Sequence, residues 1–172
     1  MKKLYMLTLA VVLVLSVLAF NGSVASAKET KIMEFSTMTG VPRPYTGSAN
    51  MIRGLAGGGL PWVIGFAEGE LKANGKIEVT VRGLLIDPND PAAITAGRAG
   101  TNPSPNMKVI VSCLSKDDSG TPTTVNVSTE LFPVDANGDG QIEDRVSLPQ
   151  PCIAPIIFVT SSTGAWFAAT GF

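Results

Sequence analysis

The stretch KIEVTVRGLLI, Lys76 to Ile86, alternates apolar and polar side chains with a period of two. In an extended chain Ile77, Val79 and Val81 would share one face, and the charged and hydroxyl side chains between them would share the other. This period is typical of a half-buried β-strand and does not fit an amphipathic helix. The stretch therefore predicts a strand that packs one face on a hydrophobic core.

The residues before this strand predict its partner. The stretch WVIGFAEGELKANGK, 62–76, carries the turn signal Asn74-Gly75. A two-residue turn would set Lys72 opposite Ile77 and place a charge in the apolar face. A three-residue loop, 73–75, sets Leu71 opposite Ile77 instead, so we expect a hairpin with this loop and with Gly75 in the left-handed conformation.

The same alternation recurs along the chain and predicts an all-β fold. Further strands are expected within 107–114, 123–131, 141–148, 153–160 and 165–172, with a less regular one at 31–38. No segment shows a helical period of apolar residues. Closely spaced strands separated by Gly, Pro and Asn predict a single β-sandwich of about seven to eight strands, Greek-key or immunoglobulin-like, with a small β-barrel as the alternative.

The N-terminus predicts export. Lys2 and Lys3 precede an apolar run at 7–20, and the triplet Ala25-Ser26-Ala27 follows. The run is shorter than the roughly 20 residues of a transmembrane anchor, so 1–27 is expected to be a cleaved signal peptide. The destination would be the extracellular space, or the periplasm if the source has an outer membrane, with no membrane span after cleavage.

The mature chain is expected to divide into two regions. Residues 28–61 would form an N-terminal strand and a glycine-rich lead-in, and residues 62–172 would form the sandwich core. Within the core, residues 87–106 show no periodicity and contain four prolines. Loops of this length are functional or mobile in most compact domains, so this one is a candidate recognition surface, with a plain solvated loop as the alternative.

Charge and residue types limit the classes of partner and of chemistry that are expected. After loss of Lys2 and Lys3, 11 basic side chains remain against 14 acidic ones, and no basic cluster is interleaved with aromatics. Nucleic acid and anionic membrane surfaces are therefore not expected as partners. The chain has no histidine, the usual general base and a common zinc ligand.

A hydrolase that uses two carboxylates remains conceivable, with Glu68, Glu70 and Glu78 as candidates. These residues alternate along predicted strands, as solvent-facing side chains do, and lysine and arginine are their neighbours. We therefore expect a protein that is not an enzyme.

Two cysteines, Cys113 and Cys152, lie 39 positions apart. In an exported protein an even number of cysteines predicts a disulfide. The alternative is a pair of buried thiols. A redox site is not expected, because the chain has no C-x-x-C spacing.

The stretch DANGDGQIED, 135–144, matches the D-x-[DN]-x-[DN]-G pattern, with Asp135, Asn137 and Asp139 at its alternate positions. Over about ten residues it resembles the calcium loop of EF-hands and dockerins. Position 12 is Val146 rather than glutamate, and the flanks are strands, so the match is closer to the strand-flanked loops of integrin-type propellers. Those loops end with an acid at position 9, which here is Glu143.

The resemblance implies that the side chains of Asp135, Asn137, Asp139 and Glu143 bind Ca²⁺ together with the carbonyl of Gln141, while Ile142 turns toward the core. Repulsion among three carboxylates on one small loop favours this interpretation. The alternative is a hairpin turn without metal, because Asn-Gly followed by Asp-Gly is also a strong turn signal.

The ending LPQPCIAPIIFVTSSTGAWFAATGF, 148–172, is similar to short exported bacterial proteins that carry no assigned activity, through its Leu-Pro, Cys, Ala-Pro and Trp-Phe-Ala series. That resemblance implies export and a β domain, and no ligand.

Three functions follow, in order of expectation. The first is a secreted, calcium-stabilised structural or adhesive module of the cell surface or matrix, which could self-associate through an edge strand. The second is an extracellular module that binds carbohydrate or another ligand, with Trp62 and Trp166 as a possible ligand surface and core packing as their alternative role. The third is the carboxylate hydrolase.

Overall fold

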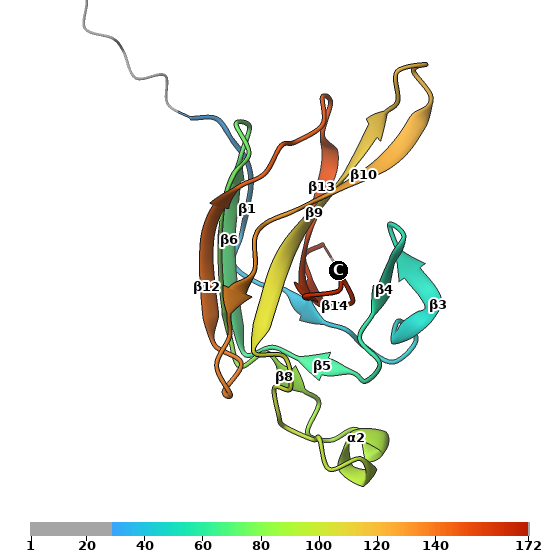
Figure 1. Cartoon of the computed structure of the whole chain (residues 1–172), viewed down its shortest axis with the longest axis vertical. Coiled ribbons are helices and arrows are strands. Elements are labelled where there is room, and N and C mark those ends of the chain that lie inside the picture. The colour runs from blue at the N-terminus through green and yellow to red at the C-terminus, as the bar shows by residue number, and fades with distance from the viewer. Residues whose placement is uncertain (1–28, 172) are drawn as a thin grey trace, which may run out of the picture.

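The computed structural model describes residues 29–171, and nearly all of its regular structure is β (Figure 1). The predicted signal peptide, 1–27, lies outside the described residues. The strands are β1 (Lys31–Phe35), β2 (Thr39–Gly40), β3 (Gly47–Ile52), β4 (Leu55–Gly57), β5 (Trp62–Val63), β6 (Phe66–Lys72), β7 (Lys76–Arg82), β8 (Leu85–Ile86), β9 (Asn106–Lys116), β10 (Pro122–Ser128), β11 (Phe132–Pro133), β12 (Gly140–Arg145), β13 (Ile153–Ser161) and β14 (Trp166–Ala169). A short helix, α2 (Pro91–Thr95), lies between β8 and β9.

Strands β1, β6, β7 and β12 form a four-stranded antiparallel sheet in that order. The predicted β6–β7 hairpin is confirmed, because Leu71 lies opposite Ile77 and Gly75 has a φ of 84°. A β-carbon on Gly75 would clash with the carbonyl of Val146, so this turn needs glycine for space as well as for its backbone angle.

The second sheet has eight strands, of which six follow the order β10-β9-β13-β14-β4-β3, while β11 also pairs with β9 and β2 with β14. The sheet curls, so that the β3–β4 turn at one end of the strand order comes close to β10 at the other end (Figure 1). There Asn126 of β10 donates a hydrogen bond to the Arg53 carbonyl at 3.0 Å, and the Arg53 guanidinium donates to the Ala154 carbonyl at 3.1 Å.

The hydrophobic core lies between the two sheets and inside the curl of the larger one. Its fully buried large side chains come from both sheets, and they are Trp166, Phe158, Leu71, Ile77, Leu84, Met107, Ile157, Val41, Val79, Val81, Val109 and Val111. The alternation predicted for 76–82 is therefore confirmed, with Ile77, Val79 and Val81 inward.

The chain passes between the sheets through the β11–β12 hairpin, where Val134 bridges to Gly140. The fold is thus an all-β sandwich that is partly closed, or a half-barrel. A two-stranded sheet of β5 and β8 pairs Trp62 with Ile86. Among residues 29–171 no helix has the length and apolarity to cross a bilayer.

Three features differ from expectation. Residues 29–171 contain fourteen strands rather than seven or eight, because several are two or three residues long and too short to show a period. Of the expected N-terminal region 28–61, the described residues 29–61 contribute β1 to one sheet and β2, β3 and β4 to the other. The loop 87–106 contains α2 and is tied down, since the amide of Ile86 donates to the Thr101 carbonyl at 3.0 Å.

Candidate functional sites

The acidic turn, residues 135–139, connects β11 to β12 as a closed hairpin turn. The amide of Asp135 donates to the Asp139 carbonyl at 3.0 Å, and the amide of Gly138 donates to the Asp135 carbonyl at 3.0 Å. Oδ1 of Asp135 accepts the amides of Asn137 at 2.8 Å and Asp139 at 3.0 Å. The carboxylate of Asp135 thus organises its own turn, as Asx-turns do.

Two of the five predicted calcium ligands have side chains engaged by residues outside the turn. Oδ1 of Asp139 accepts the amide of Gly83 at 2.8 Å, and the Glu143 carboxylate forms an ion pair with Lys76 at 2.7 Å. Among residues 29–171 no three His, Cys, Asp or Glu side chains gather where they could hold a metal ion. The hydrogen bonds within 135–139 are those of an Asx-type hairpin turn.

Calcium binding by Asp135, Asn137, Asp139, Gln141 and Glu143 therefore stays a prediction of the sequence pattern. The inward turn expected for Ile142 is confirmed, since only 9% of its surface is exposed.

Four glutamates form a row across the outer face of the four-stranded sheet. Glu34 lies opposite Glu70, Glu70 opposite Glu78, and Glu78 opposite Glu143, so each strand contributes one carboxylate. Like charges placed directly opposite one another destabilise a sheet. The row therefore needs compensation from neighbouring residues.

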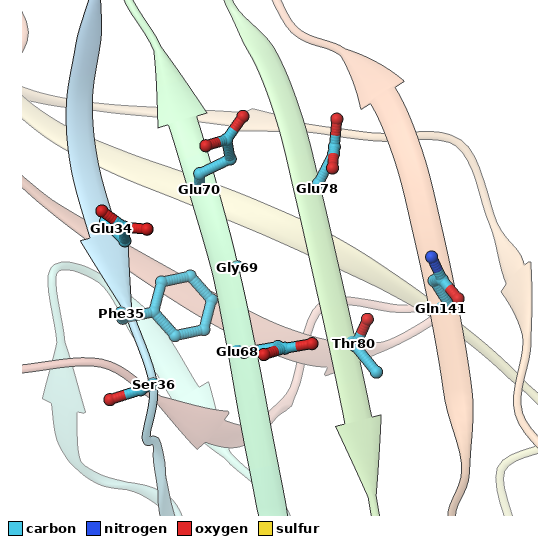
Figure 2. A pocket seen from close by; sticks show the side chains of 9 residues that line it. All are labelled: Glu34, Phe35, Ser36, Glu68, Gly69, Glu70, Glu78, Thr80 and Gln141. Carbon is cyan, nitrogen blue, oxygen red and sulfur yellow. The ribbon is translucent and has the colours of Figure 1, made fainter.

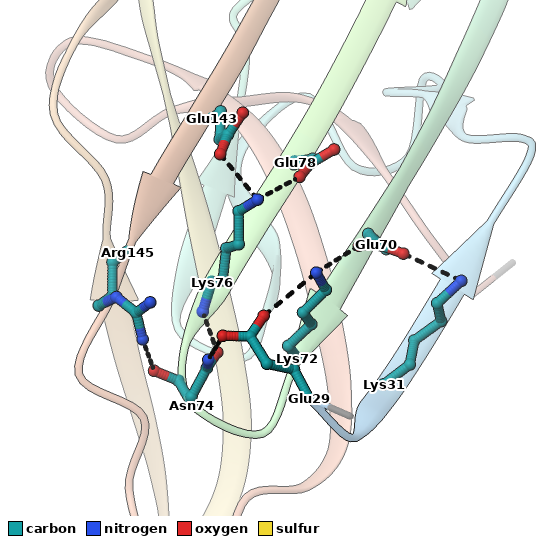
Figure 3. A network of polar contacts seen from close by, with 9 residues as sticks. All are labelled: Glu29, Lys31, Glu70, Lys72, Asn74, Lys76, Glu78, Glu143 and Arg145. Atoms are coloured by element: carbon teal, nitrogen blue, oxygen red, sulfur yellow. Dashed lines mark hydrogen bonds and ion pairs between the residues drawn. The ribbon is translucent and has the colours of Figure 1, made fainter. Parts of the chain in front are cut away.

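Lysines supply that compensation (Figure 3). Lys31 contacts Glu34 and Glu70, both at 2.9 Å. Lys76 contacts Glu78 at 2.8 Å and Glu143 at 2.7 Å. Each of these lysines bridges two neighbouring members of the row, so this surface is a charge-paired solvated face.

Beside the row lies an open depression of about 510 Å³ (Figure 2). It contains the three glutamates considered for a hydrolase, Glu68, Glu70 and Glu78. Hydrogen bonds from Lys31 and Lys72 lower the pKa of Glu70. A general acid needs a raised pKa, so the electrostatics around Glu70 oppose that role.

Another cavity, of about 330 Å³, lies between the long loop and the aromatic side chains of Trp62 and Phe167. Trp62 stacks on Phe167 with ring centroids 3.9 Å apart and planes inclined by 17°. Arg98 and Ser104 of the loop border the same cavity. Sequence reasoning named Trp62 and the loop separately, and the fold places them together.

Both tryptophans are largely core residues. Trp62 is 5% exposed, and Trp166 has no exposed surface and packs edge-on to Phe158 at 5.9 Å. Trp166 is therefore not part of a ligand surface in this structure. Trp62 borders the cavity with a small remaining area, and neither ring presents a face on which a sugar could stack.

The predicted disulfide is confirmed between Cys113 of β9 and Cys152, just before β13. The alternation along 107–113 places Cys113 on the same side as Met107, Val109 and Val111, and like them it is fully buried. A disulfide indicates an oxidising compartment such as the extracellular space.

The long loop is anchored by a residue pair that sequence reasoning missed. Asp90 is 6% exposed, and the Arg43 guanidinium donates to its two oxygens at 2.8 and 2.7 Å. Oδ1 of Asp90 also accepts the amides of Ala92 and Ala93, at the start of α2. The dipeptide Asp90-Pro91 could have predicted this helix start, because Asp favours the N-cap and Pro the first helical turn. Nothing in the sequence identified Arg43 as the partner.

The outermost strand of the eight-stranded sheet, β10, is also a candidate interaction site. Its sequence, PTTVNVS, has no charged residue, and every residue is exposed or half-buried. Among the described residues it pairs in the sheet with β9 alone, so its other edge has no strand partner. The β3–β4 turn lies nearby, since the Asn126 side chain donates to the Arg53 carbonyl.

Comparison of the chain with protein-family models, with curated proteins and with solved structures finds no match.

Proposed function

We propose that this protein is an exported, non-enzymatic structural or adhesive module that associates with a second copy of itself through strand β10. The observation that carries the proposal is the regular, uncharged edge of β10. Residues 1–27 and the disulfide support export into an oxidising compartment. Calcium stabilisation of the 135–139 turn is a separate part of the proposal.

The four strands at the edges of the two larger sheets differ in how they are protected. Edge strands are normally protected by charges, bulges or irregular pairing. Strand β1 contains Lys31 and Glu34, and β12 contains three consecutive charged residues, 143–145. Strand β3 is uncharged, yet it pairs with β4 only near its two ends, with a register shift between them.

Strand β10 has no charge, bulge or irregular pairing, and Pro122 at its first position is its one residue of a type that protects edges. It pairs with β9 at seven consecutive positions, from Pro122 opposite Lys116 to Ser128 opposite Ile110, without a register shift. A regular ladder of this kind leaves the backbone flat and available to another strand. Its threonines and valines have high β-propensity.

A second copy is the partner that fits this edge. Two β10 strands can pair antiparallel about a two-fold axis over about 24 Å, the length of seven residues. No charged side chains would meet across such a ladder. Leu114 of β9 lies opposite Thr124 of β10 and, on its other side, opposite Ile153 of β13. Leu114 is 41% exposed and Ile153 is 55% exposed, so exposed apolar surface continues from the β10 edge across the neighbouring strands.

Sedimentation velocity of the exported chain over a range of concentrations tests the proposal. We expect a dimer that dissociates on dilution. The paired substitution Thr124→Lys and Ser128→Lys should weaken association at least about tenfold, because the introduced lysines would be diagonal neighbours on one face of the ladder and would repel each other. Both positions are exposed, so the fold should persist.

The matched control is Ser48→Lys with Ala49→Lys on the β3 edge, which should leave the dimer intact. Circular dichroism would verify that both variants are folded. A wild-type chain that stays monomeric at every concentration, or a dimer that only the β3 variant dissociates, contradicts the proposal.

A ligand-binding module is the second candidate. The observation in its favour is the cavity between Trp62 and the long loop.

A further inference from the structure

We infer that the cavity between Trp62 and the long loop binds a small apolar carboxylate, either a single aromatic ring or a short alkyl chain that bears one carboxyl group. The inference rests on the second candidate function and is independent of self-association through β10.

The floor of the cavity suits an apolar body. Trp62 and Phe167 form a stacked pair, and Ile86, only 3% exposed, borders the same space. Leu60 adds a half-buried wall. The volume of about 330 Å³ is within the range of small-molecule sites, which are concave and mainly apolar with a few polar groups.

Arg98 supplies the charge at this cavity. Its side chain is exposed, and no ion pair or side-chain hydrogen bond to its guanidinium is found among residues 29–171. Arg43, which contacts the same loop, is instead engaged by Asp90 at 2.7 Å. A guanidinium at the border of an apolar cavity matches a carboxylate, which it can bind through two parallel hydrogen bonds.

The backbone that carries Arg98 is held in place. Its carbonyl accepts the amide of Thr101 at 3.2 Å and the Thr101 hydroxyl at 2.7 Å. The amide of Arg98 donates to the Ala93 carbonyl at 2.9 Å, which ties it to α2. Because this backbone is already ordered, it loses little further conformational entropy when a ligand binds.

The test compares octanoate and benzoate with the neutral analogues octanol and benzyl alcohol, and with N-acetylglucosamine. Isothermal calorimetry would measure affinity, and the NMR resonance of the Trp62 indole N–H would locate the site. We expect the carboxylates to bind and to shift this resonance, and the alcohols to bind at least about tenfold more weakly.

Arg98→Gln should lower carboxylate affinity about tenfold and leave alcohol affinity unchanged. The matched control is Arg82→Gln, because Arg82 lies over Phe66 on the other sheet. Gly59→Leu should weaken every ligand: Gly59 borders the cavity, and a β-carbon there meets no atom within 4 Å, so the fold tolerates it.

Equal affinity for octanoate and octanol, unchanged carboxylate binding by Arg98→Gln, or preferential binding of N-acetylglucosamine would overturn the inference. The Thr124→Lys and Ser128→Lys variant should bind octanoate like wild type. Its sedimentation and its ligand affinity thus report separately on self-association and on the cavity.

Discussion

At the scale of single residues, Asp90 has the greatest influence on the long loop. It accepts hydrogen bonds from Arg43 and from the amides of Ala92 and Ala93, so one buried carboxylate joins the N-terminal region, the loop and α2. The hydrogen bond from Arg43, followed by that from the amide of Ala93, lowers the pKa of Asp90 despite burial. The charged form is therefore the one that the fold favours.

Asp90→Asn should lower the midpoint of urea unfolding at pH 7, because asparagine still caps the helix but no longer pairs with Arg43 as a charge. A carboxyl whose pKa is lowered by folding adds stability at pH values above its unfolded pKa of about 4, and this stability is lost as the pH falls through the folded pKa. The difference between wild type and variant should therefore be constant near pH 7 and shrink below about pH 4. Asp118→Asn, an exposed control, should change little, and a difference that persists at pH 2 to 3 would count against the ion pair.

At the scale of elements, the two hairpin turns show how one kind of local signal leads to different outcomes. The β6–β7 turn was predicted in length and register, because the apolar faces of its arms can coincide in only one way. The 135–139 turn was predicted with two alternatives, and the hydrogen bonds around Asp135 correspond to the hairpin without metal. Glu143, its most distant predicted ligand, is held by Lys76 on the sheet face.

On the calcium hypothesis, the thermal midpoint in millimolar calcium should exceed that in chelator by several degrees, because an ion that binds only the folded state stabilises it by mass action. Asp135→Ala should abolish this difference and lower the midpoint in both buffers, since two backbone amides lose their acceptor. Magnesium serves as the control ion. Superimposable melting curves in calcium and chelator would contradict calcium binding and favour the hairpin turn without metal.

At the scale of the whole molecule, a covalent bond supports the curled sheet. The disulfide joins β9, the strand next to the β10 edge of the eight-stranded sheet, to the chain that enters β13. The contacts of Arg53 with Asn126 and Ala154 connect the β3–β4 turn to β10 and β13. Long-range contacts of this kind hold the curl, which no single hairpin could maintain.

Replacing both cysteines, Cys113→Ala with Cys152→Ala, should cost about 4 kcal/mol in the chain-entropy model for a closed loop of this length. The thermal midpoint should fall by about 10 °C for a domain of this size. Calorimetry of the variant, with reduced wild type as a second sample, measures the effect. A midpoint within 2 °C of the oxidised wild type would show that the bridge adds little to stability.

Much of the fold was determined by the sequence alone. The period of two at 76–82, the loop at 73–75 and the burial of Cys113 depend on neighbours along the chain, and all three are found in the structure. Such features are local, because side-chain direction in a strand alternates whatever lies across the sheet. The pairing of Cys113 with Cys152 also followed, because two cysteines leave one possible partner each.

Only the tertiary structure decided the candidate sites. The glutamate row depends on the register of four strands, and the Arg43–Asp90 pair joins residues 47 positions apart. The cavity brings Trp62 beside Arg98, and the open edge of β10 depends on the order of strands in its sheet. These arrangements arise from contacts between distant segments, which leave no periodic trace in the sequence, so packing alone determines them.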